Sequence, residues 1–302
     1  MSKNFSSDEH RILNLFKVNN SFILNNNKYT ILNSGKPTCA SGEPKTDIYV
    51  LAESNGNKIE IKISYKKDNA DFLENKISAE RAEQIFGDNW SDIIINSTSK
   101  LKKEFSSRPL IYLEKANHTE AGSITLGWKF ELLNVKSGLL SEKLPLTKKQ
   151  VINVYAGTNL SKDKKDANVN GQNIKNSGIA NFMLVEDKPI KTLQNAIDKI
   201  VTIEDYVKEN PNIYFACKAL NYRTFKLKYD GDRPLAVSIH WFVNNDSKLD
   251  YKFIFTSPLK YGGNITAFKL ANAMSQLGIT NTTELNINNL SSRIIIIGKL
   301  PQ

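Results

Sequence analysis

Three residues in the first quarter of the chain combine two acids with a lysine. Asp47 comes just before the apolar segment 48–51, and Glu60 and Lys62 lie two residues apart in the next apolar segment, 59–64. Two carboxylates can hold a divalent cation beside a phosphodiester, where the metal polarises the phosphate and lowers the pKa of a bound water. A lysine on the same face can orient that water or stabilise the charge of the transition state. The pattern predicts metal-dependent hydrolysis of phosphodiesters.

The two segments must be neighbouring strands if these side chains are to meet. Alternate side chains of a strand point to the same face, so Glu60 and Lys62 share one. A two-residue turn at Asn55-Gly56 places Asp47 on that face but opposite Ser64, roughly 13 Å along the strand from Glu60. A longer loop, or a bulge or bend at Asp47, would bring the two acids within reach of one magnesium ion, which binds its ligands at about 2.0–2.1 Å. The sequence leaves these registers open.

The residues from Glu43 to Asp47, followed by Glu60-Ile61-Lys62, resemble the signature of the PD-(D/E)xK nuclease superfamily, which includes most type II restriction endonucleases. The resemblance implies that Asp47 and Glu60 bind Mg²⁺, that the carbonyl of Ile61 is a further ligand, and that Lys62 is the catalytic lysine. It covers residues 37–86, and it departs from the family pattern because Pro44 does not directly precede Asp47. The alternative is an ordinary Glu–Lys contact on the solvated face of a β-hairpin.

Other acids are candidates for a supporting role. Glu43 enters the same strand as Asp47 and is a possible supplementary acid, whereas Glu80 and Glu83 on a following helix and Glu9 on the first helix either reach the site or form solvated faces. The three histidines show no cluster spacing, and His240 is expected to pack in an apolar strand. The chain has no Gly-rich phosphate-binding signature and no nucleophile elbow, which argues against an NTPase or an α/β-hydrolase.

Composition favours an acidic partner. The 302 residues carry a net charge of +10 with a pI near 9.3, and the excess is spread over both halves. Such a balance favours nucleic acid as the partner, with an anionic membrane as the second possibility. The resemblance to the nuclease superfamily implies double-stranded DNA, bound by the chain alone or as a homodimer. No apolar run is long enough to span a bilayer, and the first residues contain no apolar signal core. We therefore expect a cytoplasmic protein without membrane contact, in which Cys39 and Cys217 are reduced.

Periodicity and turn signals predict an α/β (α+β) fold. We expect a restriction-endonuclease-like mixed sheet flanked by helices in residues 1–186, and a β-rich recognition part in residues 187–302, as two domains or one continuous domain. The patterns also predict a helix over 69–86, a half-buried strand over 124–132, a short helix bracketed by Thr147 and Gly157, a loop or linker over 159–178 and a helix over 192–208.

Basic and aromatic residues outside the motif are candidates for DNA contact. They form one group after the expected helices of the first half and a second group in the β-rich half. The members are Lys100, Lys102, Lys103 and Arg108 in the first group, and Lys218, Tyr222, Arg223, Lys226, Arg233 and Lys260 in the second. Lys260 also lies in a loop that leads to a helix N-terminus, where backbone amides could hold a phosphate.

These observations predict a Mg²⁺-dependent endonuclease that hydrolyses double-stranded DNA, most plausibly at specific sequences in a restriction system. One alternative is a repair or junction-resolving nuclease that recognises DNA structure. The other is a DNA-binding protein without catalytic activity, in which the Glu–Lys face is surface. Discrete cleavage products from a long duplex would separate the first two, and binding without cleavage under any divalent ion would favour the third.

Overall fold

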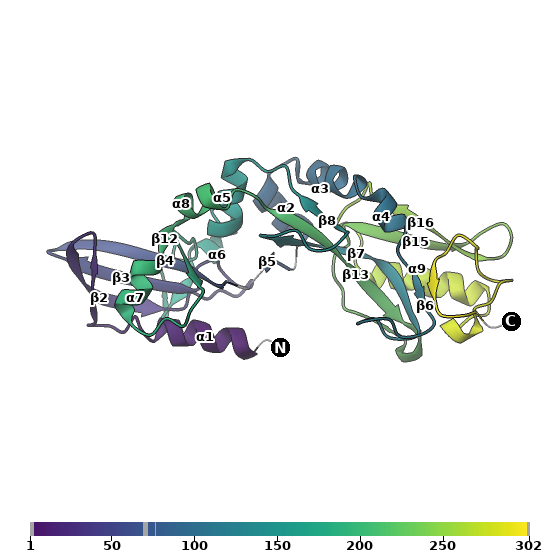
Figure 1. The fold of residues 1–302 in the computed structure, drawn as a ribbon, viewed down its shortest axis with the longest axis horizontal. Helices are drawn as coiled ribbons and strands as arrows, with labels where there is room; N and C mark the ends of the chain where they lie inside the picture. The colour runs from purple at the N-terminus through teal and green to yellow at the C-terminus, as the bar shows by residue number, and fades with distance from the viewer. Residues whose placement is uncertain (1–2, 69–71, 76, 301–302) are drawn as a thin grey trace. The chain divides into compact units, whose positions relative to one another are not determined.

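The computed structural model describes residues 3–68, 72–75 and 77–300 (Figure 1). The chain divides into two compact units, each built from two separate segments. Unit 1 contains Met1–Asp71 and Leu146–Asn212, and unit 2 contains Phe72–Pro145 and Ile213–Gln302. This division differs from the boundary expected after Glu186, because each unit takes strands from both halves of the sequence.

Unit 1 is organised around a six-stranded mixed sheet. The order is β1 (Ser21–Leu24), β2 (Asn27–Gly35), β3 (Ile48–Ser54), β4 (Asn57–Lys67), β11 (Phe182–Glu186) and β12 (Val201–Thr202). The strands from β1 to β4 are antiparallel neighbours, β11 runs parallel to β4, and β12 is antiparallel to β11. A parallel neighbour requires a long crossover connection, and here the chain between β4 and β11 contains the first segment of unit 2.

Helices α1 (Lys3–Leu13) and α7 (Leu193–Lys199) cover one face of this sheet. Ile12, which belongs to α1, and Ile197, which belongs to α7, share a core with the inward side chains of β3 and β4, such as Val50 and Ile63. Helices α5 (Lys148–Ala156) and α8 (Ile203–Glu209) pack side by side, and α8 contacts β11 (Figure 1).

Helix α5 has the ends that the sequence predicts. The Thr147 hydroxyl and the Gln150 side chain form a reciprocal capping box at its start. Gly157 follows its last turn at φ 75°, a left-handed conformation that glycine adopts without steric cost.

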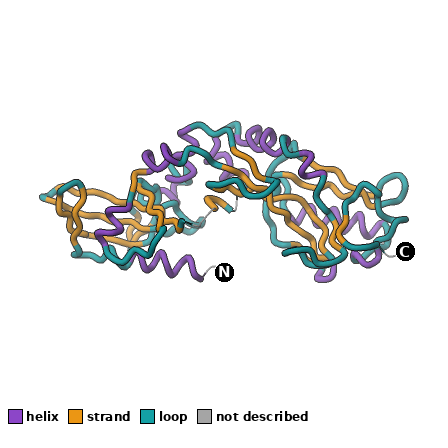
Figure 2. The backbone as a smooth tube through the Cα atoms, viewed as in Figure 1, coloured by secondary structure: helices purple, strands orange, loops and turns teal. Residues whose placement is uncertain are grey.

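Unit 2 contains a nine-stranded sheet around β7 (Ser123–Leu133), whose neighbours are β13 (Tyr214–Arg223) and β15 (Val237–Val243). The remaining strands are β14 (Lys228–Tyr229), β16 (Leu249–Ile254), β5 (Phe72–Glu74), β6 (Ile111–Tyr112), β8 (Ser141–Lys143) and β17 (Ile296–Ile297). The α-helices are α2 (Ala79–Phe86), α3 (Trp90–Ser99), α4 (Lys102–Ser106) and α9 (Gly263–Gln276), and 3-10 turns span Thr224–Lys226 and Thr282–Glu284. Both units thus combine strands with helices, and the chain is a mixed α/β protein of the α+β kind (Figure 2).

Several local expectations need correction. Residues 72–74 form strand β5, and the described helix of that region begins at Ala79 with Ser78 as its cap; residues 69–71 and 76 of the expected helix lie outside the described residues. The expected helix over 192–208 is two helices separated by β12, because Thr192 and Thr202 each cap a helix of their own.

Burial also differs from expectation in two places. Every residue of β7 except Lys129 is buried, so the strand is not half-buried. Helix α9 contacts both β7 and β15 and covers the face that carries the smaller side chains of β7. Residues 159–178 are no linker, since they form α6 (Lys162–Lys165) and the hairpin of β9 (Asn168–Val169) and β10 (Gln172–Asn173) within unit 1. None of the helices in the described part of the chain has both the length and the apolar composition that a bilayer crossing requires.

Candidate active site

The β3–β4 hairpin has the shorter of the two expected turns. Asn55 and Gly56 adopt φ angles of 50° and 78°, as a two-residue turn of the primed type requires. The register pairs Leu51 with Glu60 and Tyr49 with Lys62. Asp47 therefore stands near Ser64 and not near Glu60, so the structure does not bring together the two acids expected to share a metal ion.

The side chains of Glu60 and Lys62 are engaged in contacts within the hairpin. Their charged groups lie 3.6 Å apart, and the hydroxyl of Tyr49 donates to Glu60 at 2.7 Å. Burial and this bond raise the pKa of Tyr49. The Asn181 side chain binds the backbone on both sides of Ile61, accepting from the Lys62 amide at 2.7 Å and donating to the Glu60 carbonyl at 2.9 Å. The side chain of Ile61 belongs to the core.

Asp47 lies at a bend just before β3, and its carboxylate points to the far end of β4. Its Oδ2 accepts the amide of Tyr65 at 2.7 Å, while its own amide donates to the carbonyl of Ile63 at 2.8 Å. The carboxylate thus takes the place of a backbone acceptor where the regular ladder ends. Burial raises the pKa of Asp47 to about 6, with Lys66 opposing this shift and Glu9 adding to it.

The charges of two lysines and a second acid act on Asp47. Lys66, at the end of β4, and Lys36, just after β2, both lower the pKa of Asp47 by their charge. Glu9, from α1, binds Lys36 with an Nζ–Oε2 distance of 2.6 Å. We call Asp47, Glu9, Lys36 and Lys66 the Asp47 cluster. It contains two carboxylates and two ammonium groups at one end of the unit 1 sheet.

Glu9 was a predicted candidate of this cluster, whereas Lys36 and Lys66 were not predicted from the sequence. Lys66 follows Ser64 with the spacing that separates Lys62 from Glu60, on the same face of β4. This second polar–x–Lys pattern could have predicted that Lys66 lies near Asp47, because the two-residue turn places Asp47 opposite Ser64. Lys36 gave no signal, since its approach depends on contacts between distant segments.

A buried network holds α1 against the ends of β4 and β11. Glu186 receives both Arg11 Nη2 contacts at 2.6 Å, the Tyr65 hydroxyl and the amide of Ile190 at 2.8 Å. Burial alone would raise the pKa of Glu186, but these hydrogen bonds outweigh it and lower the pKa. Asp8 on α1 pairs with Lys67, which follows Lys66. The network fixes the helix that carries Glu9 next to the strand that carries Lys66.

The remaining acids stand apart from this cluster. Glu43 is exposed in the loop before Asp47, and its charge acts on Lys36. Glu80 and Glu83 lie on α2 of unit 2. Among the described residues, no three His, Cys, Asp or Glu side chains converge closely enough to hold a metal ion by themselves.

Several expected DNA contacts in unit 2 are engaged within the protein. Arg223 pairs with Glu120 at 2.8 Å and with Asp230 at 2.7 Å, and Lys226 pairs with the same Glu120 at 2.7 Å. Lys218 lies 3.0 Å from Glu131, which is buried. For these three residues a direct contact with DNA would require breaking an ion pair, which the sequence could not reveal.

The other candidates are less constrained. Lys102 and Lys103 are exposed on α4, and Arg108 has a buried Nε with no hydrogen-bond partner among the described residues. Lys260 is exposed near the ring of Tyr261, and Tyr222 and Arg233 are half-buried.

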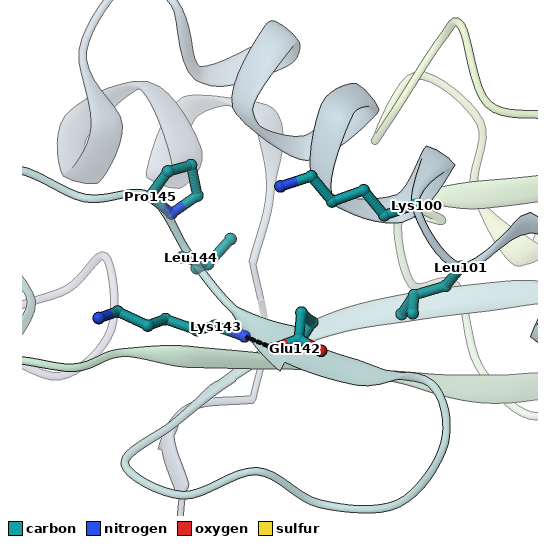
Figure 3. Close-up of a pocket in the computed structure, with 6 residues that line it drawn as sticks. All are labelled: Lys100, Leu101, Glu142, Lys143, Leu144 and Pro145. Carbon is teal, nitrogen blue, oxygen red and sulfur yellow. Dashed lines mark hydrogen bonds between the residues drawn. The ribbon is translucent and has the colours of Figure 1, made fainter.

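Lys100 lines an open depression of about 480 Å³ with Leu101, Glu142, Lys143, Leu144 and Pro145 (Figure 3). Glu142 accepts from the Lys143 amide at 3.0 Å and pairs with Lys136 at 2.9 Å. A carboxylate therefore lies among the cations of this surface and offsets its positive charge.

Comparison with known proteins adds no assignment. No protein-family model, no curated protein and no solved structure matches the chain.

Proposed function

We propose that the protein is a Mg²⁺-dependent endonuclease of double-stranded DNA and that its active site is the Asp47 cluster. The observation that carries the proposal is the position of Asp47, held by the Tyr65 amide beside Lys66, with Glu9 and Lys36 at the same end of the sheet. The net charge of +10 supports a polyanionic substrate.

The architecture of unit 1 supports the same proposal. The resemblance to the PD-(D/E)xK superfamily implies a mixed sheet flanked by helices, with the acid and the lysine on adjacent strands. In unit 1, Asp47 precedes β3, and Lys66 is the next-to-last residue of the adjacent β4 within a mixed sheet. The proposal moves the lysine from Lys62 to Lys66 and removes Glu60 from the ligand set.

The donor set suits magnesium. Mg²⁺ keeps several waters and is commonly held by one or two carboxylates together with phosphate oxygens of the substrate. Asp47 and Glu9 provide carboxylates of this kind. Burial raises the pKa of Asp47 by disfavouring the ionised carboxylate, and a bound cation would stabilise that ionised form. When bound, the ion would polarise the scissile phosphate and lower the pKa of its water.

Each residue of the cluster has a distinct role in this proposal. Asp47 is oriented by the Tyr65 amide and is mostly ionised at neutral pH, because its pKa is about 6. Lys66 positions the attacking water or stabilises the developing charge on the phosphate. Lys36 holds Glu9 and adds positive charge where the phosphate would lie.

One observation favours a second candidate, a DNA-binding protein without catalytic activity. Glu60, the acid of the motif, is bound by the Tyr49 hydroxyl and lies beside Lys62, so the motif itself forms an internally paired hairpin face. In this case the Asp47 cluster would be a structural polar cluster.

Incubation of supercoiled plasmid and long linear DNA with the protein tests the proposal. We expect cleavage in Mg²⁺ and none in EDTA, with discrete fragments if the enzyme reads sequence. Asp47→Asn should abolish cleavage, whereas Asp198→Asn, a matched change of an exposed acid on α7 in the same unit, should not. Binding without cleavage in any divalent ion would reject the nuclease in favour of the second candidate.

A further inference from the structure

A small pocket in unit 2 has a lining that suits an anion. It lies between β15, the end of β16 and α9, and its volume is about 140 Å³. The residues that line it are Ser238, Ile239, His240, Ile254, Tyr261, Thr266 and Lys269. Pockets for whole small-molecule ligands usually measure about 300–1,000 Å³. This one is sized for a single group of a larger ligand that continues across the surface.

Positive charge gathers around this pocket without a facing acid. Lys269 lies 4.9 Å from the ring centroid of Tyr261, and Lys260 lies 5.7 Å from it. Lys252 is the cross-strand partner of His240. No acidic side chain lines the pocket in the described part of the chain. Asp250, which shares a face of β16 with Lys252, is engaged by Arg293 at 2.6 Å.

His240 reports this positive environment. Burial lowers its pKa, and the charges of Lys269 and then Lys252 lower it further. Its ring stacks on that of Phe242 with a centroid distance of 5.8 Å and an interplanar angle of 23°. The residue is exposed, and an exposed stacked ring beside lysines is a surface that can accept a nucleobase as well as a phosphate.

The other basic surfaces of unit 2 lack this combination. The cations Arg223 and Lys226 are paired with Glu120, and the depression near Lys100 contains Glu142. In the pocket next to Lys269, by contrast, an ammonium group, hydroxyl groups and an imidazole meet without a carboxylate in the lining.

We propose that this pocket binds a phosphate group of a nucleic-acid strand, held by Lys269 and His240 with the hydroxyl groups of Ser238 and Thr266 close by. Naming the strand as nucleic acid rests on the proposed function; the phosphate chemistry follows from the pocket alone. A free phosphate or nucleotide would present the same group, so the experiment must separate these two sources.

Binding by the full chain without metal is the first test. The probes are a short fluorescein-labelled single strand, the same sequence as a duplex, and unlabelled inorganic phosphate as competitor. Lys269→Gln should weaken binding of at least one labelled probe by about tenfold or more, the size of a lost charge-assisted contact. Lys115→Gln, a matched change of an exposed lysine elsewhere in unit 2, should leave affinity unchanged. Wild-type affinity for both probes in Lys269→Gln would overturn the proposal.

The imidazole of His240 supplies a second measurement. Its NMR signal is assignable because the chain has three histidines and His240→Gln removes one. We expect its pKa to rise when the oligonucleotide binds, because the negative phosphate stabilises the imidazolium and offsets the repulsion from Lys269 and Lys252. A rise with inorganic phosphate but none with oligonucleotide would identify a free-phosphate site and contradict the assignment to a strand.

The result is separable from the nuclease proposal. If Lys269→Gln weakens strand binding but the wild-type protein cleaves no DNA, the phosphate pocket is supported and the nuclease proposal is rejected. If the protein cleaves DNA and Lys269→Gln binds it as tightly as wild type, the nuclease proposal is supported and the phosphate pocket is rejected.

Discussion

The carboxylate of Asp47 accepts the main-chain amide of Tyr65 at 2.7 Å, so the acid is held at the far end of β4 from Glu60. This contact determines which residues can act with Asp47. It separates Asp47 from the Glu60–Lys62 pair and places it under the influence of Lys66, Glu9 and Lys36.

The ionised carboxylate of Asp47 should lower the free energy of unfolding at neutral pH. Its pKa rises from an ordinary 3.8 to about 6 because the carboxylate is buried. Between these values the folded state binds more protons than the unfolded state, so this contribution to stability falls as pH rises through the window. Asp47→Asn keeps an acceptor for the Tyr65 amide and should raise the free energy of unfolding at pH 7 by about 1–3 kcal/mol.

Urea unfolding at pH 7 and pH 5 measures this effect. The gain from Asp47→Asn should shrink at the lower pH, where the wild-type acid is largely protonated, and Asp198→Asn should show neither change. A loss of stability in Asp47→Asn, or a gain that does not vary with pH, would contradict the assigned environment.

Glu186 should be essential to the sheet end that carries the cluster. It is buried, and Glu186→Ala removes the acceptor of the Tyr65 hydroxyl and the closest carboxylate partner of Arg11, which keeps its contacts with the Ile190 carbonyl and Asp8. Removing one partner of a buried pair costs about 3–5 kcal/mol, and we expect about 2–4 kcal/mol because Arg11 is partly exposed. The measurement is the urea midpoint, with the exposed Glu209→Ala as control.

The pH dependence of that loss has a defined sign. The pKa of Glu186 is lowered in the fold, so its contribution is present above the unfolded value and lost as pH falls. The difference in the free energy of unfolding between wild type and Glu186→Ala should therefore decrease as the pH is lowered. A constant difference would mean that packing, and not the charged pair, stabilises this end of the sheet.

Binding to DNA without metal should weaken steeply with salt. Each neutralised phosphate contributes about −0.9 to the slope of log affinity against log salt, because counterions are released. The charge of +10 is the basis of this prediction. Fluorescence anisotropy over a salt series measures the slope, and a flat dependence would remove the argument from charge to DNA.

Arg223 and Arg233 should differ as DNA contacts. Arg223 is held by Glu120 and Asp230, so Arg223→Ala should leave the preference for cognate over scrambled duplex unchanged. Arg233 has no ion pair of this kind in the described structure, and Arg233→Ala should cost about 1–3 kcal/mol of discrimination if it reads a guanine. Affinities in Ca²⁺, where cleavage is suppressed, provide the comparison; a larger loss in Arg223→Ala would reverse the assignment.

Local signals predicted much of the fold. The Asn55-Gly56 turn, the Thr147 cap and the Gly157 stop each act within a few residues, and the structure contains all three. The exchange of segments between the two units was not predictable, because it depends on which strands pair across long separations. The same limit applies to Glu9, which approaches Asp47 through the packing of α1 on the sheet, and to Lys36, which follows β2 and pairs with Glu9.

The most direct test of the Asp47 site is single-turnover cleavage of plasmid DNA in Mg²⁺ by two matched variants, Lys66→Met and Lys62→Met. Loss of a group that acts on the water or the phosphate typically lowers the rate by about 10²–10⁴. We expect a loss of this size in Lys66→Met and a rate near that of wild type in Lys62→Met, whose lysine is paired with Glu60. Near wild-type cleavage by Lys66→Met, together with an inactive Lys62→Met, would contradict the assignment of the active site to the Asp47 cluster.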